Sequence, residues 1–497
     1  MASAVQKTFS DLLPLSNATL AALPAEVRRP GYDRSGLTAG IVHIGVGNFH
    51  RAHQAWYLSR LMEMGLAQDW AILGAGVRPY DAAMRDKLLA QDCLTTLIEL
   101  DGDHRAAEVI GSMIDYVPVA EGHGPLIAAM ADPAIRIVAM TVTEGGYFQL
   151  GGALDISHPE IVHDAANPDR PCTVFGAIIA ALRLRRERGD GPVTLLSCDN
   201  LQGNGAILRG VVLGLARLSD PALADWIEES CSFPNSMVDC IVPATGEREL
   251  DFARAFGVND AAPVSHEAFR QWVIEDDFCA GRPPLEKVGV TYSGSVHDYE
   301  MMKLRILNAG HQMVANAGAL LGLETIAEAT THPAVGAFLH KVLSEEVAPH
   351  VPSVAEFTPD QYITLIKRRF SNPSIVDTTR RVAFDGSSRH PGFVLPSLRD
   401  ALLSDGGFSG LALTEALWAR YCLGTTEAGE AIAANDPQWD RLTKRAREAV
   451  DRPQAWLEMS AIYGDLAQDP RFATAFADWM GILAQDGVEA AIALYVG

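Results

Sequence analysis

Short apolar runs alternate with longer amphipathic stretches through the first part of the chain. After a polar lead-in over residues 1–38, runs that are typical of buried strands lie at residues 41–44, 70–77, 93–100, 135–142 and 193–197. Helical periodicity fills segments between them, as at residues 175–188. Strands that alternate with helices predict a largely parallel sheet covered by helices.

The hydrophobic pattern changes after Val296. Strand-like runs end, and helical periodicity dominates, for example at residues 333–343, 360–370, 411–421 and 440–450. With 497 residues the chain is also too long for one core. We therefore expect an α/β domain over residues 1–295 and a mostly α-helical domain over residues 296–497, with an active site in the cleft between them.

A glycine turn follows the first apolar run. Residues 41–44 lead into Gly45-x-Gly47, and helical periodicity begins at about Arg51. In a Rossmann-type dinucleotide-binding unit, the first glycine allows the tight turn and the second lets the backbone approach the pyrophosphate at a helix N-terminus. His50 stands where a third glycine is usual, so the spacing alone leaves an unrelated glycine turn open.

The end of the second apolar run bears on the choice of cofactor. In folds that bind NAD, an acidic residue at this point usually holds the adenosine ribose. This chain has Arg78 there. An arginine in that place can accept the 2′-phosphate of NADP, and a solvated surface arginine is an equal alternative.

Polar loops follow two later apolar runs. The segment TEGGY, which contains Glu144, follows residues 135–142, and the segment CDN, which ends at Asn200, follows residues 193–197. Functional loops lie at the carboxyl ends of parallel strands. Glu144 is therefore expected near the nicotinamide, with a plain turn as the alternative.

One largely apolar stretch, residues 299–322, carries several polar side chains and no proline. This pattern predicts a helix that is buried on several sides. At about 100° per residue, one face holds Glu300, Lys303, Leu304, Leu307, Asn308 and His311. Because burying a polar group without a partner is costly, these groups are expected to be partnered.

Two interpretations of this face are open. In the first, Lys303 pairs with Glu300 one turn away, and His311 is a hydrogen-bonded core histidine. In the second, Lys303 is a general base, because desolvation and the positive end of a helix dipole both lower the pKa of a lysine. A base poised near neutral pH suits removal of a proton from an alcohol.

Five blocks of the chain carry more specific motifs, in a fixed order. They are GxGxFHRAH at residues 45–53, CDN-x3-NG at 198–205, NSMVD at 235–239, K-x4-N-x2-H at 303–311 and R…DGSSR…P at 381–391. From about residue 40 to beyond residue 390, the sequence resembles the long-chain polyol dehydrogenases of the mannitol 2-dehydrogenase type. Two departures stand out: Cys240 follows NSMVD where many relatives have a basic residue, and Arg389 replaces a lysine of some relatives.

The resemblance implies roles for the matched residues. In the family the lysine of K-x4-N-x2-H is the catalytic base, here Lys303. With it we expect an oxyanion held by two amides, an orienting imidazole and a proton relay, provided by Asn200, Asn308, His311 and Glu300. The cofactor is expected to lie against Gly45, Gly47, Asn48, Phe49, His50 and Arg51, with Arg78 and Glu144 nearby. The polyol hydroxyls are expected to meet Asp239, Arg381 and Arg389.

Composition excludes several classes of function. A formal net charge of −22 argues against nucleic acid and anionic membranes as partners, and no uncharged apolar run is long enough to span a bilayer. Seven scattered cysteines without CxxC spacing suit a reducing compartment, so a cytoplasmic protein is expected. The 14 histidines show no zinc-ligand spacing, so no metal is expected.

Together these patterns predict metal-independent, NAD-dependent oxidation of a secondary alcohol of a polyol to a ketose, of the mannitol-to-fructose type, with arabinitol and sorbitol as further candidates. Lys303 is the expected base, and NADP is the alternative cofactor. A second possibility is reduction of a sugar-acid ketone such as fructuronate or tagaturonate, with Arg381 and Arg389 facing a carboxylate. A third is a non-catalytic NAD-binding sensor. The resemblance also implies a monomer.

Overall fold

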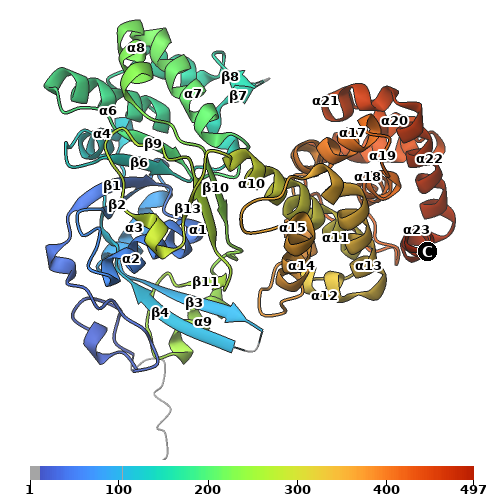
Figure 1. Cartoon of the computed structure of the whole chain (residues 1–497), viewed down its shortest axis with the longest axis horizontal. Coiled ribbons are helices and arrows are strands. Elements are labelled where there is room, and N and C mark those ends of the chain that lie inside the picture. The colour runs from blue at the N-terminus through green and yellow to red at the C-terminus, as the bar shows by residue number, and fades with distance from the viewer. Residues whose placement is uncertain (1–11, 103, 151) are drawn as a thin grey trace, which may run out of the picture. The chain divides into compact units, whose positions relative to one another are not determined.

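The computed structural model describes residues 12–102, 104–150 and 152–497. The chain divides into two compact units, Met1–Val296 and His297–Gly497, which run from blue to yellow-green and from olive to red in Figure 1. Each unit has its own hydrophobic core. No helix among the described residues combines the length and the apolar character needed to cross a membrane.

A five-stranded parallel sheet forms the centre of the first unit, with strand order β5-β2-β1-β6-β9. Its strands are β1 (Ala39–Ile44), β2 (Ala71–Ala75), β5 (Met113–Tyr116), β6 (Ile137–Met140) and β9 (Thr194–Ser197). Four of the five predicted apolar runs form strands of this sheet, and the run at residues 93–100 forms β3 in a second sheet. The predicted Rossmann-type fold is confirmed.

Both faces of the central sheet are covered, which explains why its strands are continuous apolar runs. Along β1, Val42 and Ile44 pack in a cluster with helices α6 and α7, whereas Ile41 packs in a cluster with α2. The helices of the first unit are α1 (Asn48–Ala52), α2 (Gln54–Glu63), α3 (Asp81–Leu89), α4 (Gly124–Met130), α5 (Pro159–Ala166), α6 (Val174–Arg188), α7 (Asn204–Ser219), α8 (Pro221–Ser230) and α9 (Glu247–Ala255).

Smaller sheets flank the central one (Figure 1). They contain β3 (Thr95–Asp101), β4 (His104–Ile110) and β11 (Val264–Glu267); β10 (Ser236–Asp239), β12 (Gln271–Ile274) and β13 (Thr291–Tyr292); and β7 (Gln149–Leu150) with β8 (Ala153–Leu154). A parallel bridge between Thr194 and Ser232 sets the chain before β10 alongside β9. The NSMVD block therefore begins next to the CDN block.

The second unit is built from helices packed around α11 (Ala309–Leu320), most of which is fully buried. Its other α-helices are α10 (Val296–Met302), α12 (Ile326–Thr331), α13 (Pro333–Lys341), α14 (Pro359–Phe370), α15 (Thr379–Val382), α16 (Gly386–Arg389), α17 (Leu395–Leu403), α18 (Ser409–Tyr421), α19 (Trp439–Asp451), α20 (Gln454–Leu457), α21 (Ser460–Tyr463), α22 (Pro470–Gln485) and α23 (Gly487–Val496). The helices predicted at residues 360–370, 411–421 and 440–450 are α14, α18 and α19. Three π-helical segments interrupt the unit: η7 (Lys303–Asn308), η8 (Val342–Val347) and η10 (His390–Val394).

Local sequence fixes the start of α14. The hydroxyl of Thr358 accepts from the N–H of Gln361 at 3.3 Å, and the Gln361 side chain accepts from the N–H of Thr358 at 2.9 Å. Pro359 takes the first helical position, where no N–H is needed. The helix then ends at Phe370, a buried residue of the site described below.

The helix predicted over residues 299–322 is not a single α-helix. It consists of α10, the π-helical segment η7 and α11. A π turn is closed by i→i+5 hydrogen bonds, so wheel positions at about 100° per residue do not hold through it. Lys303 and Asn308 are its first and last residues and stand one such turn apart.

Candidate functional site

The glycine turn after β1 closes against the neighbouring strand β6. Gly45 has φ +90°, and a Cβ there would stand 2.0 Å from the carbonyl oxygen of Thr141. The Thr141 hydroxyl donates to the carbonyl of Gly45 at 2.6 Å. At Gly47, by contrast, an added Cβ would meet no described atom within 4 Å. The turn thus packs tightly on one side and leaves open space at Gly47, which fits a dinucleotide pyrophosphate.

The helix after this turn differs from the prediction. It begins at Asn48, not at about Arg51, and it breaks at His53, where φ is −121° and ψ is −88°. The chain continues as α2 from Gln54. A helix of five residues has a weak dipole. A helix terminus of this length offers little to an anion, and the backbone N–H groups of the turn are the stronger donors here.

Arg51 is only 1% exposed and bonds to the protein itself. Its guanidinium donates to the carbonyl of Gly47 at 3.3 Å, to the side-chain oxygen of Asn48 at 2.7 Å and to the carbonyl of Ala262. The amide of Asn48 donates in turn to the carbonyl of Pro243 at 3.0 Å. The structure thus places both side chains as braces of the turn, with the charge of Arg51 directed inward.

His50 lies beneath the turn, not on an open surface. Its ring stacks on that of His43, with centroids 3.5 Å apart, and each histidine is 1% exposed. Burial lowers the pKa of His43 to about 3 and the pKa of His50 well below its usual value, so both rings are neutral. Phe49 stacks on His53 at 4.9 Å. Two stacked ring pairs, His43 with His50 and Phe49 with His53, thus flank the glycine turn in the sequence.

Arg78 follows β2, as predicted, and forms an ion pair. Its guanidinium lies 3.3 Å from the carboxylate of Glu160. The backbone N–H groups of Val77 and Arg78 both donate to the carboxylate of Asp81, at 2.9 Å each. An acidic residue, Asp81, thus stands three positions after Arg78 at the start of α3, where its carboxylate binds the backbone of the turn. The ion pair with Glu160 partly compensates the charge of Arg78.

The loop after β6 is held by a carboxylate from the segment that directly follows β9. Asp199 accepts from the N–H groups of Val142 and Thr143, at 3.1 and 2.8 Å, and from the hydroxyl of Tyr147 at 2.7 Å. Asp199 is 7% exposed, and Tyr147 is fully buried. The loop TEGGY and the residue before Asn200 are therefore one hydrogen-bonded unit.

One residue of the same loop has a strained backbone conformation. Thr143 has φ +68° and ψ 159°, a combination that is almost confined to glycine. Such a conformation costs about 1–3 kcal/mol and persists only where the surroundings enforce it. The 3₁₀ turn η5 (Glu144–Tyr147) follows directly. The predicted site residue Glu144 lies in this turn, and its side chain is outside the part of the structure that is described.

The CDN-x3-NG block is joined to NSMVD by Asn204. Its amide donates to the carbonyls of Asp199 and Ser236, at 3.0 and 2.8 Å, and its oxygen accepts from the N–H of Ser236 at 2.9 Å. Asn235 accepts from the first N–H groups of α7, at 2.9 and 3.2 Å. These bonds fix the segment after β9 against β10, which ends at Asp239. This segment carries the half-buried Asn200.

In the second unit, Lys303, Asn308 and Glu300 are 9%, 8% and 4% exposed. They therefore lie on a buried face of the helical stretch, as predicted. Lys303 is two turns beyond Val296, where that stretch begins. A helix dipole acts within about the first turn, so the dipole part of the argument for a lowered lysine pKa is wrong, and burial is the effect that remains. Glu300 lies 3.6 Å from the ring of His297, which is largely exposed.

His311 lies among the arginines of the R…DGSSR block. Burial lowers the pKa of His311 to about 3; Asp377 acts in the opposite direction, and the cations of Arg381, Arg369 and Arg389 add to the lowering. The structure therefore brings His311, Arg381 and Arg389 together, as predicted for the second unit. Arg369, at the end of α14, is a member of this group that the motifs did not indicate.

The arginine segment is tied to α11 through one carbonyl. The oxygen of Val382 accepts from Arg389 at 2.7 Å and from the buried amide of Gln312 at 2.9 Å. Arg381 makes a two-point ion pair with Asp377. A hollow of about 320 Å³ adjoins these groups and is lined by Thr378, Arg380, Arg381, Phe384, Arg389 and Asn435.

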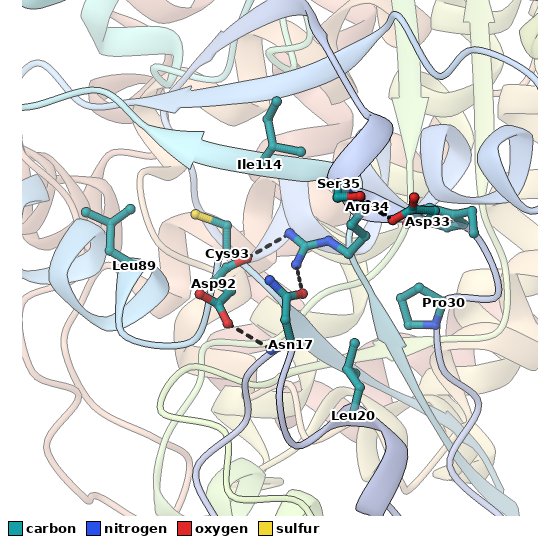
Figure 2. Close-up of a pocket in the computed structure, with 11 residues that line it drawn as sticks. Asn17, Leu20, Pro30, Asp33, Arg34, Ser35, Leu89, Asp92, Cys93 and Ile114 are labelled. Atoms are coloured by element: carbon teal, nitrogen blue, oxygen red, sulfur yellow. Dashed lines mark hydrogen bonds between the residues drawn. The ribbon is translucent and has the colours of Figure 1, made fainter.

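A larger hollow of about 460 Å³ lies elsewhere in the first unit (Figure 2). Its polar groups largely bond to one another: Arg34 donates to Asn17 and to the carbonyl of Asp92, and Asp33 accepts from Ser35. The lining contains none of the predicted site residues.

Three possible metal ligands lie close together, and their ligand atoms are all within 4.8 Å of one another: His163, Asp164 and Cys172. The carboxylate of Asp164 already accepts from the N–H groups of Cys172 and Thr173, at 2.7 and 3.0 Å. Burial raises the pKa of the Cys172 thiol to about 12, which disfavours the thiolate that a metal needs. The bonds of Asp164 therefore hold the chain at Cys172 and Thr173 in place.

Comparison with known proteins decides the family. A model of the mannitol dehydrogenase Rossmann domain matches residues 39–287, and a model of the mannitol dehydrogenase C-terminal domain matches residues 295–482. The chain belongs to the mannitol dehydrogenase family.

Other members of the mannitol dehydrogenase family match almost the whole chain. A mannitol 2-dehydrogenase of Cereibacter sphaeroides is 55% identical over 94% of this chain and 98% of its own. The structure of Pseudomonas fluorescens mannitol 2-dehydrogenase in ternary complex with NAD and D-mannitol matches with a TM-score of 0.89 at 38% identity, covering 97% of this chain and 99% of that one. A substrate-free D-sorbitol dehydrogenase matches with a TM-score of 0.87 at 36% identity, covering 97% and 100%.

Some residues of this candidate site were named in motifs but given no role. Asp199 and Asn204 stand within CDN-x3-NG, and their place in the same motif as Asn200 was the available signal. Phe370 stacks on the ring of His311 in α11, and Tyr147 bonds to Asp199 after β9. Neither residue carried such a signal, because its partner lies far along the chain.

Proposed function

We propose that this chain oxidises a secondary alcohol of a polyol to the ketose with NAD, with Lys303 as the general base. The observation that carries the proposal is a buried lysine that opens a π-helical segment and shares it with Asn308, in a member of the mannitol dehydrogenase family. Burial disfavours the charged form of an amine. A neutral amine can take the proton of a substrate hydroxyl.

Stabilisation of the developing alkoxide falls to two amides, Asn308 and Asn200. Each can donate to the substrate oxygen as the C–H bond weakens. One such donor is worth about 3–4 kcal/mol in the transition state. When bound, NAD accepts the hydride. The carboxylate of Asp199 binds the N–H of Thr143, and its carbonyl accepts from the amide of Asn204, so the backbone directly before Asn200 is held in place.

The proton leaves the base by way of Glu300 and His297. Glu300 is 4% exposed, and its carboxylate lies 3.6 Å from the largely exposed ring of His297. This pair supplies a route from a buried group to solvent. His311, which is neutral, orients the substrate by a hydrogen bond and takes no part in the proton transfer.

Contacts to the other hydroxyls are assigned to Arg381, Arg389 and Asp239. Arg381 is held rigidly by Asp377, and Arg389 by the carbonyl of Val382, so both present fixed donors. Some relatives have a lysine at this position. Arg389 instead supplies a planar guanidinium with several donors in place of a compact ammonium. We infer that this difference tunes the choice among mannitol, arabinitol and sorbitol.

For the cofactor, we propose that Gly45, Gly47 and the backbone around Asn48 hold the pyrophosphate. Arg51, His50 and Phe49 support the turn from behind. Pairing of Arg78 with Glu160 leaves less of its charge for a 2′-phosphate and favours NAD over NADP. Glu144 is kept as a proposed neighbour of the nicotinamide.

The other two functions are not favoured. A sugar-acid ketone reductase needs a free cation for the substrate carboxylate, whereas Arg381 is neutralised by Asp377. A cofactor-binding sensor has no need of a buried lysine beside an amide and an imidazole. A cytoplasmic location and a monomeric state complete the proposal, on the charge and cysteine usage of the chain and on the family resemblance.

A panel of polyols and sugar acids, assayed with NAD and with NADP at the nicotinamide absorbance band, tests the proposal. We expect NADH formation with mannitol or a related polyol and much weaker activity with NADP. Turnover of sugar acids alone, or cofactor binding without any polyol oxidation, would contradict it.

A further inference from the structure

The loop that Asp199 holds is unusual in its backbone. Thr143 at its start and Phe148 just after it both have positive φ, +68° and +50°. Neither residue is a glycine, and a threonine with a branched Cβ is poorly suited to such a conformation. The loop therefore does not adopt this shape by its own preference and must be held in it.

The Asp199 carboxylate is the group that holds it. Two backbone N–H groups and the phenol of Tyr147 converge on its two oxygens. Burial raises the pKa of the Tyr147 phenol well above its usual value, so the phenol stays a donor. The hydroxyl of Ser197 lies 2.6 Å from the same phenol and completes the cluster from within β9. Three converging donors need an acceptor-only group, which a carboxylate is and a carboxamide is not.

Asp199 is also connected to Asn200, the residue to which the proposed function gives a role in catalysis. It directly precedes Asn200, and its own carbonyl accepts from Asn204 at 3.0 Å. On the other side, Thr141, two residues before the loop, bonds to the carbonyl of Gly45. A shift of the Asp199 carboxylate is therefore transmitted to Asn200 and to the edge of the dinucleotide turn.

We propose that Asp199 is a positioning residue for hydride transfer: it holds the loop from Thr143 to Tyr147 in its strained conformation and so fixes that loop relative to Asn200. The inference rests on the proposed function, because the role of Asn200 belongs to that function. The inference adds Asp199 to that function as a residue that positions the loop and takes no part in proton or hydride transfer.

Asp199→Asn tests the proposal by placing an amide where the loop supplies donors. We expect faster amide hydrogen exchange in the segment from Val142 to Tyr147, and a kcat for polyol oxidation that is lower by between about ten- and a hundredfold. With a polyol deuterated at the oxidised carbon, the isotope effect on kcat should rise, because hydride transfer becomes more rate-limiting. A merely structural role would lower the folded fraction and leave the isotope effect unchanged.

Thr143→Gly supplies the rescue. Glycine adopts the required φ without strain, so adding it to Asp199→Asn should restore kcat several-fold. Asp132→Asn is the matched control, because Asp132 accepts a similar short-range bond from the N–H of Ala134, at 2.8 Å, in an exposed turn. It should change neither hydrogen exchange in the loop nor turnover.

Three outcomes decide the question. A normal kcat and isotope effect in Asp199→Asn would overturn the proposal, and so would a loss that Thr143→Gly leaves uncorrected. If the unaltered chain oxidised no polyol, the proposed function would fail by itself. The loop-holding role would then be judged by hydrogen exchange and by NADH affinity, and unchanged values of both in Asp199→Asn would overturn it.

Discussion

The imidazole of His311 lies flat on the ring of Phe370, with centroids 4.0 Å apart and planes 8° from parallel. The stack fixes the orientation of the imidazole, and burial lowers the pKa of His311 to about 3. His311 therefore stays uncharged over the whole range in which the enzyme can be assayed. An imidazole in this state can orient a hydroxyl but adds no ionisation to the pH dependence.

Replacement of His311 should therefore lower activity without moving the pH profile. For His311→Asn we expect kcat/KM for the polyol to fall by about tenfold or more, the equivalent of one lost hydrogen bond of about 1.4 kcal/mol. Phe370→Leu, which removes only the stack, should give a smaller loss. A shift in the midpoint of the kcat/KM profile of His311→Asn would show that the ring titrates after all.

Two glycines of the dinucleotide turn should respond differently to alanine. At Gly47, φ is −85° and an added Cβ would meet no described atom within 4 Å, so Gly47→Ala should fold with an unchanged melting temperature but bind NADH more weakly. At Gly45 the Cβ would lie 2.0 Å from the Thr141 carbonyl with φ +90°, so Gly45→Ala should lose stability. NADH fluorescence titration and thermal melts separate the two effects. Normal NADH affinity in Gly47→Ala would show that the cofactor does not approach the turn there.

Much of the first unit could be predicted because its signals are local. A run such as residues 41–44 is apolar because both faces of the sheet are covered, and Gly45 follows because the turn needs positive φ. The inward direction of Arg51 could not be predicted in this way. Its acceptor, the carbonyl of Ala262, comes from a loop that is distant in sequence.

In the candidate site of the second unit, too, features with local signals could be predicted and features that depend on tertiary packing could not. The sequence pattern correctly predicted that Lys303 and Asn308 are buried, because apolar neighbours surround them. The π turn between them has no sequence pattern of its own, since it depends on how η7 packs against α14 and η10. The surroundings of His311 likewise depend on tertiary packing, because Phe370 and Arg369 come from another helix.

Buried histidines should make the protein sensitive to acid. Burial lowers the pKa values of His43 and His266 to about 3, whereas the unfolded chain protonates histidine near pH 6.5. The unfolded state therefore binds more protons between these values, and stability falls as pH drops from about 6.5 to 3, by about 1.4 kcal/mol per pH unit for each histidine. Urea unfolding at several pH values measures the slope, and His43→Gln should reduce it by one such increment. An unchanged slope in that variant would contradict the assignment.

A second buried network should dominate the stability of the helical unit. His390 and Glu415 are both fully buried, 2.7 Å apart, and the other oxygen of Glu415 accepts from Tyr463 at 2.8 Å. Removal of one partner of a buried pair typically costs about 3 kcal/mol or more, so Glu415→Ala should unfold at clearly lower urea concentration. The exposed pair of Arg399 and Asp465 is the control, and Asp465→Asn should leave the midpoint in place. Equal midpoints for the two variants would refute the prediction.

The most direct test of the base is the rate of NADH formation from D-mannitol by Lys303→Ala, measured alongside its affinity for NADH. Because the amine of Lys303 must be unprotonated to accept the hydroxyl proton, polyol oxidation by the unaltered protein should rise with pH. Loss of this general base should lower kcat by about 10²–10⁴-fold and remove that rise, while NADH binds as before. Lys444→Ala, at an exposed lysine of α19, should behave like the unaltered protein. Near-normal turnover in Lys303→Ala, with the pH dependence intact, would contradict the account.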